Sequence, residues 1–121
     1  MKPSLEADRV YIAHMLECIG RISEYTGDDE AHFRASRLIQ DAVVRNLQTL
    51  AESSQRLTEQ TKASEPAVPW RSIAGFRNIL VHDYLAMDVD VIWQVVANEL
   101  PPLHAALQRM ADRLCRDEPS R

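Results

Sequence analysis

The side chains best suited to chemistry in this sequence gather in one octet, residues 77–84, which reads Arg-Asn-Ile-Leu-Val-His-Asp-Tyr. Arginine binds phosphate oxygens through a planar fork of donors. Histidine takes up and releases protons near neutral pH. Tyr84 adds a hydroxyl group, and the amide of Asn78 can orient a neighbouring group. Because these polar groups flank the apolar run 79–81, the octet is a candidate site for a substrate that contains phosphate.

Groups of these kinds can cleave RNA without a metal ion. The ribose 2′-hydroxyl attacks the adjacent phosphorus, a base removes its proton, an acid assists the leaving 5′-oxygen, and a cation stabilises the added negative charge. His82 could move the protons and Arg77 could supply the cation. A structural interpretation is also open, in which Arg77 pairs with an acid, His82 ends a helix and Tyr84 packs against the bundle.

The rest of the chain must provide the elements that position the octet. With 121 residues, of which 45% are hydrophobic and 26% charged, the chain is expected to form a single domain over residues 1–121. Only 3 glycines and few β-branched runs favour helix over sheet. The sequence therefore predicts an all-α domain of about five helices, with residues 116–121 as a frayed tail.

Local signals place these helices. The first is predicted over residues 4–25 with Ser4 as its cap, and the second from residue 29 or 31 to residue 58, where apolar residues from Leu38 to Leu57 recur with a period near 3.6. A polar linker, residues 58–69, precedes a third helix that ends in the octet. A fourth begins after Asp88, and the two prolines at 101 and 102 are expected to kink or interrupt the run before residues 103–114.

A row of polar residues also marks the second helix. Its members, spaced i, i+4, i+7 and i+11, share one helical face: Asp41, Arg45, Gln48 and Glu52. The simpler interpretation is a solvated face with an ion pair between Asp41 and Arg45. The alternative is a polar seam that faces a partner or the site.

Helical geometry separates the two main groups of the octet. Asn78 and His82 are four residues apart and would stack on one face, whereas Arg77 and His82 are five apart, or about 140° around the axis. A twofold axis could solve this divergence by bringing a helix from each of two protomers together. Alternatively, the helix breaks near His82 and Asp83 and Tyr84 form an irregular turn.

Charge and cysteine usage narrow the possible functions. The net charge of -4 argues against broad coating of nucleic acid but does not exclude a small RNA-cleaving site. The two cysteines, Cys18 and Cys115, are expected to be reduced thiols, and without a CxxC pair or an HExxH motif no zinc site is expected. The sequence has no signal-peptide core and no apolar run of the roughly 20 residues that cross a bilayer, so the expected location is the cytoplasm.

The octet resembles the RNxxxHxY signature of the HEPN superfamily, and specifically of HepT-like toxins. Residues 41–47, Asp-Ala-Val-Val-Arg-Asn-Leu, are similar to the family segment around Arg-Asn-Leu. Residues 69–77 are similar to its PW-x-x-I-x-G-x-R lead-in, and residues 92–93 and 100–101 match late positions, so the resemblance covers about residues 5–115. One departure lies at residues 50–52, Leu-Ala-Glu, which keep the glutamate of many relatives but not the glycine before it.

This resemblance implies an antiparallel helical bundle that forms a homodimer, with the motif helices meeting at the twofold axis. It implies a metal-independent endoribonuclease without a cofactor, acting on RNA and not on DNA or membranes, as the toxin of a type VII toxin–antitoxin pair. By position, Arg77 and His82 would be catalytic and Asn78 would support them. Tyr84 would receive AMP from an antitoxin, a nucleotidyltransferase of the MntA type. The alternative is a non-catalytic dimer that binds nucleotide or serves as the partner subunit of a nucleotidyltransferase.

Overall fold

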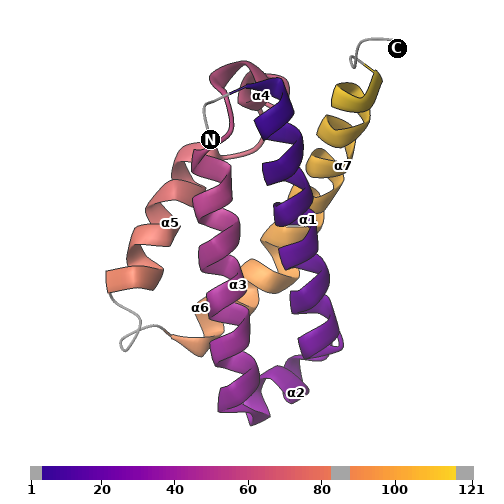
Figure 1. The fold of residues 1–121 in the computed structure, drawn as a ribbon. Coiled ribbons are helices and arrows are strands. Elements are labelled where there is room, and N and C mark those ends of the chain that lie inside the picture. Colours follow the sequence, from indigo (N-terminus) through magenta and orange to yellow (C-terminus); the bar gives the residue numbers. More distant parts are fainter. Residues whose placement is uncertain (1–3, 83–87, 117–121) are drawn as a thin grey trace.

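A computed structural model describes residues 4–82 and 88–116 of the chain. Within these ranges all regular elements are helical (Figure 1), and none of the helices is long and apolar enough to cross a membrane. The predicted all-α bundle is confirmed. In chain order the elements are α1 Leu5–Thr26, α2 Glu30–Ala35, α3 Arg37–Gln55, α4 Glu59–Ala63, α5 Trp70–His82, α6 Val89–Gln94, a π-turn Val95–Glu99 and α7 Leu100–Arg116.

Helices α1, α3 and α7 form the body of the bundle. α1 packs against both α3 and α7, and α5 packs on α3 at the side away from α1 (Figure 1). The apolar faces predicted from helical spacing meet at the centre, because burying them removes apolar surface from water. The side chains most completely buried there are Ile12, Met15, Ile22, Phe33, Val43, Leu80, Leu107 and Met110.

The predicted second helix is two helices. Ser36 takes an extended backbone conformation, and its hydroxyl accepts a hydrogen bond from the backbone N–H of Ile39 at 3.2 Å, so it caps a new helix. The Nε2 group of Gln40 donates to the carbonyls of Phe33 and Arg34, both at 3.1 Å. These hydrogen bonds satisfy two of the carbonyl groups at the C-terminal end of α2. Leu38 follows the break and is 79% exposed, although its spacing predicted a place on the apolar face.

The predicted linker contains a short helix that is tied to the start of α1. The buried carboxylate of Asp8 accepts hydrogen bonds from the backbone N–H of Thr58 at 2.9 Å and from the hydroxyls of Thr58 and Thr61, both at 2.6 Å. Three donors compensate the cost of burying this carboxylate. The contact fixes the chain as it leaves α3 and begins α4.

The two prolines do not interrupt the last helical run. The π-turn immediately precedes them, and the N–H of Leu100 donates to the carbonyl of Val95, five residues earlier. Prolines lack an N–H group and clash with the carbonyl four residues earlier in a regular helix. A wider π-turn relieves both constraints, and Pro101 and Pro102 then occupy the first turn of α7. Residues 89–116 are therefore helical throughout.

Candidate active site on helix α5

Helix α5 carries the described part of the octet, and its apolar side determines which residues face outward. Leu80 is fully buried, while Ile73 and Phe76 are half-buried and pack on the core. At the start of the helix, the indole N–H of Trp70 donates to the carbonyl of Lys62 at 3.1 Å. The helix runs through His82, so a helix break before that residue does not occur.

The outer face of α5 is formed by residues at a spacing of i, i+4, i+7 and i+11. These four residues are all exposed: Arg71, Gly75, Asn78 and His82. Ile79 borders them and is 47% exposed. Asn78 and His82 therefore share one face, as the sequence predicted, and both side chains are accessible to a substrate.

Arg77 lies at the flank of this face and is only half-exposed. Its Nη1 group donates a hydrogen bond to the Oδ1 atom of Asn78 at 3.3 Å. The backbone positions of Arg77 and His82 diverge as predicted, but the guanidinium is turned toward Asn78, which lies on the same face as His82. Asp83 and Tyr84, the last two residues of the octet, lie outside the described residues.

The segment before α5 is held against α7 by an ion-pair cluster that the sequence did not predict. The buried carboxylate of Glu65 accepts hydrogen bonds from Arg109, at 2.7 Å from Nη2 and 3.2 Å from Nε, and from Nη2 of Arg113. The hydrogen bonds from Arg109 and Arg113 lower the pKa of Glu65 to about 2, against the opposing effect of burial. The cluster joins residues more than forty positions apart, so local sequence patterns carry no signal of it.

The stability that the Glu65 cluster gives to the fold should depend on pH. The pKa of Glu65 is depressed in the folded protein from an ordinary value of 4.5. The stabilisation of the fold by the ionised carboxylate is therefore complete above about pH 4.5 and is lost as the pH falls toward 2. Glu65→Gln keeps the shape but removes the charge, and should lower the free energy of unfolding by about 2 kcal/mol at pH 7. Urea unfolding between pH 7 and pH 3 measures this difference, which should shrink in acid.

Glu59→Gln is the matched control. The Glu59 side chain is 92% exposed and pairs with Lys62 at 3.0 Å, so its loss should change the unfolding free energy by about 0.5 kcal/mol or less. Equal effects of the two substitutions, or an effect of Glu65→Gln that does not depend on pH, would contradict the role assigned to the cluster.

A groove of about 700 Å³ separates α5 from α7. Its walls are mostly apolar and come from α3, α5 and α7, with Leu47, Leu50, Ile73, Phe76, Leu100 and Leu103 among the lining residues. Arg77, Asn78 and His82 do not line it. The groove therefore borders α5 on a side different from the face that carries the polar groups of the octet.

The polar row on α3 is only partly solvated. Asp41 and Arg45 are exposed, whereas Gln48 and Glu52 are half-buried. Asp41 forms an ion pair with Arg37, one turn earlier, with 3.2 Å between Nε and Oδ1. The row thus combines a solvated end with an end that the bundle partly covers.

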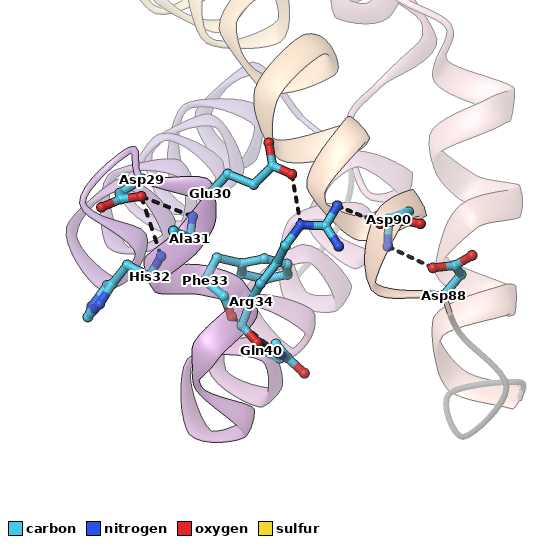
Figure 2. Close-up of polar contacts among 9 residues, drawn as sticks. All are labelled: Asp29, Glu30, Ala31, His32, Phe33, Arg34, Gln40, Asp88 and Asp90. Atoms are coloured by element: carbon cyan, nitrogen blue, oxygen red, sulfur yellow. Dashed lines mark hydrogen bonds and ion pairs between the residues drawn. The ribbon is translucent and has the colours of Figure 1, made fainter.

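A second cluster missed by sequence reasoning fixes the start of α6, the next described element after α5. Figure 2 shows Arg34 of α2 between Glu30 and Asp90, with its Nε 2.7 Å from Oε2 of Glu30 and its Nη2 paired with Asp90. The rings of Phe33 and Trp93 lie 5.3 Å apart. The cap of α6 was readable from sequence, because the Asp88 carboxylate accepts from the N–H of Asp90 at 2.8 Å. The ion pair that α2 supplies through Arg34 could not be predicted, because α2 was expected to be part of a longer helix.

Comparison with known proteins identifies the family. Residues 15–110 match the family model described as Ribonuclease HepT-like. The chain belongs to this family. A protein from Thermococcus cleftensis named "Probable ribonuclease HepT" is 31% identical over 101 residues, which cover 83% of this chain and 92% of that relative. The "mRNA nuclease HepT" of Shewanella oneidensis is 26% identical over 113 residues, or 74% of this chain and 84% of the relative.

One relative is a longer protein. The Methanocaldococcus jannaschii protein named "Gamma-glutamylcyclotransferase and putative RNase" is 32% identical over 107 residues, which cover 88% of this chain but only 48% of the relative. This HepT-like chain therefore spans about half the length of that protein. No solved structure matches the chain significantly.

Proposed function

We propose that this HepT-like chain is the toxin of a toxin–antitoxin pair and acts as a metal-independent endoribonuclease on cytoplasmic RNA. The observation that carries the proposal is the arrangement on α5: His82 and Asn78 share an exposed face, and Arg77 donates to Asn78 at 3.3 Å. The amide that the cation contacts thus shares a helical face with a group that can transfer protons. This arrangement favours the catalytic interpretation of the octet over the structural one.

The proposed reaction needs only groups of the chain and the RNA itself. An imidazole of His82 takes the proton of the ribose 2′-hydroxyl, and the 2′-oxygen forms a bond to the adjacent phosphorus. The bond from phosphorus to the 5′-oxygen breaks, and that oxygen receives a proton. Arg77 stabilises the negative charge that builds up on the phosphate oxygens. The products are a 2′,3′-cyclic phosphate and a 5′-hydroxyl.

The proposal includes a homodimer, because one chain supplies one imidazole and the reaction moves two protons. A second copy at the outer face of α5 would add a second His82, so that one imidazole could act as base and the other as acid. The exposed Ile79 on this face would stabilise such a dimer, because association removes its apolar surface from water.

The proposal also includes control by a nucleotidyltransferase of the MntA type, which would transfer AMP from ATP to Tyr84. The tyrosine oxygen bonds to the α-phosphorus and pyrophosphate leaves. Tyr84 is two residues after His82, so their Cα atoms lie within about 7 Å of each other in any conformation. The added phosphate would place negative charge close to the site that receives RNA.

Incubation of the purified protein with a defined RNA, in the presence of a strong metal chelator, tests the proposed activity. We expect cleavage at an unchanged rate in the chelator and products that end in 2′,3′-cyclic phosphate and 5′-hydroxyl. A requirement for added Mg²⁺ would contradict metal independence. Tight binding of nucleotide or of a nucleotidyltransferase without any cleavage would instead favour the non-catalytic alternative.

A further inference from the structure

Helix α5 differs in charge from the rest of the molecule. Its 13 residues include no aspartate or glutamate, whereas every other helical element that the structure describes contains at least one. The chain as a whole has a net charge of -4. Arg71 and Arg77 therefore give α5 a local excess of positive charge. A surface of this sign attracts a polyanion such as RNA, whose backbone carries one negative charge per nucleotide.

Arg71 is exposed, and the fold gives no reason for an arginine at its position. Among the residues that the structure describes, no carboxylate pairs with it. It also lies in the first turn of α5, where the positive end of the helix dipole disfavours a cation. Most other arginines of the described chain contact a carboxylate or an aromatic ring: Arg21, Arg34, Arg37, Arg56, Arg109 and Arg113. The guanidinium of Arg71 is thus available to a ligand.

Arg71 lies on the same outer face of α5 as Asn78 and His82. Arg71 precedes His82 by eleven residues, which complete about three turns, so the two residues share a side of the helix and lie about 16 Å apart along its axis. Along a stacked RNA strand this distance spans about five nucleotides, at about 3.4 Å each, and along an extended strand fewer. A single RNA strand that follows this face can therefore reach both residues.

We propose that Arg71 forms a phosphate subsite, which binds the RNA backbone several nucleotides from the bond that is cleaved at His82. This inference rests on the proposed ribonuclease and gives its substrate a path along α5, from His82 toward the start of the helix. The guanidinium binds a phosphate through two parallel hydrogen bonds. Contact between two copies near Ile79 and His82 leaves Arg71 accessible, because it lies about three turns away from His82. Arg71 is thus a binding residue that adds affinity for long RNA.

RNA binding by a chain that cannot cleave tests the subsite independently of the proposed activity. In a His82→Ala chain, Arg71→Ala should weaken the affinity for a single-stranded RNA about tenfold, the loss expected for one charge-assisted contact. The RNA needs about twelve nucleotides to reach Arg71 in either direction from the site. The slope of log affinity against log salt concentration should fall by about 0.7, which corresponds to one phosphate contact on a single strand. Arg71→Lys should recover part of the affinity, because it restores the charge but not the paired donors.

Arg116→Ala is the matched control. Arg116 is also exposed and pairs with no carboxylate of the described chain, but it lies at the end of α7. Its removal takes away the same charge, so its effect measures the general attraction of RNA alone. Equal effects of Arg71→Ala and Arg116→Ala, or an unchanged salt slope in Arg71→Ala, overturn the inference. A wild-type protein that binds RNA without cleaving it would overturn the proposed activity alone, and a chain that binds no RNA would overturn both.

Cleavage kinetics give a second measurement. A dinucleotide contains only the phosphate that is cleaved and cannot reach Arg71, whereas the long RNA can. In Arg71→Ala, the ratio of kcat/KM for the long RNA to kcat/KM for the dinucleotide should therefore fall about tenfold, through a higher KM for the long RNA. If kcat/KM falls equally for both substrates, Arg71 acts at the reacting phosphate or through the fold, and the assignment of a distant subsite is overturned.

Discussion

Replacing His82 with alanine is expected to lower the rate of RNA cleavage by about 100- to 10,000-fold, the range that a positioned acid or base contributes. The imidazole is exposed at the end of α5, on the face that also carries Asn78. No other side chain among the described residues of this face moves protons near neutral pH. Cleavage under single-turnover conditions measures the effect on the chemical step directly.

The folded state should be almost unaffected by the same substitution. His82 is exposed, and the core contact of α5 nearest to it is made by Leu80. A surface substitution of this kind changes the unfolding free energy by about 0.5 kcal/mol or less. His32→Ala is a matched control, because His32 is also exposed on a helix but lies on α2. A folded His82→Ala protein that cleaves RNA as fast as the wild type would remove His82 from the site.

Local signals were sufficient to predict much of the fold. The first helix was expected over residues 4–25 and spans Leu5–Thr26, because the Ser4 hydroxyl accepts from the N–H of Ala7 as a cap should. Ser36 can also cap a helix, but it lies within the stretch from residue 29 or 31 to residue 58 that was expected to be one continuous helix. Its capping role depends on Gln40 closing the end of α2, which is a contact that periodicity does not describe.

The prolines show a second limit of local reasoning. Their chemistry correctly predicted that a regular α-helix cannot pass through residues 101 and 102 unchanged. It did not predict how the chain would respond. The π-turn keeps residues 95–99 helical, with a different hydrogen-bond spacing. It thereby preserves the direction of the helical run, whose last helix, α7, packs on α1. The choice between a kink and a π-turn depends on this packing.

The candidate site was predictable to the extent that helical geometry determines it. The period of 3.6 residues placed Asn78 and His82 on one face, and both are exposed there. The same geometry did not predict the bond from Arg77 to Asn78, because a long side chain can turn away from its backbone position. The Glu65 cluster that holds the segment before α5 joins distant parts of the chain and lay beyond any local pattern.

Attachment of AMP to Tyr84 is expected to lower RNA cleavage by about 100-fold or more, comparable to the loss of a main charge-stabilising group. Tyr84 follows His82 by two residues, so the new phosphate is attached to a side chain close in the sequence to the imidazole. Its negative charge would repel the RNA phosphate, and it could also form an ion pair with the guanidinium of Arg77 in place of the RNA. Co-expression with a nucleotidyltransferase of the MntA type, followed by intact-mass measurement and cleavage assays, tests both steps.

Tyr84→Phe separates modification from catalysis, because phenylalanine keeps the ring but has no oxygen to accept AMP. The variant should cleave RNA, gain no mass on co-expression and remain toxic in the presence of the nucleotidyltransferase. The other two tyrosines, Tyr11 and Tyr25, lie on α1 and serve as controls in the same protein. Addition of AMP to Tyr84→Phe would place the modification elsewhere. Full cleavage by protein that carries AMP on Tyr84 would show that the charge does not reach the site. Because charge repulsion is screened by salt whereas steric exclusion is not, partial recovery of cleavage by the modified protein at high salt would identify charge as the main cause of inhibition.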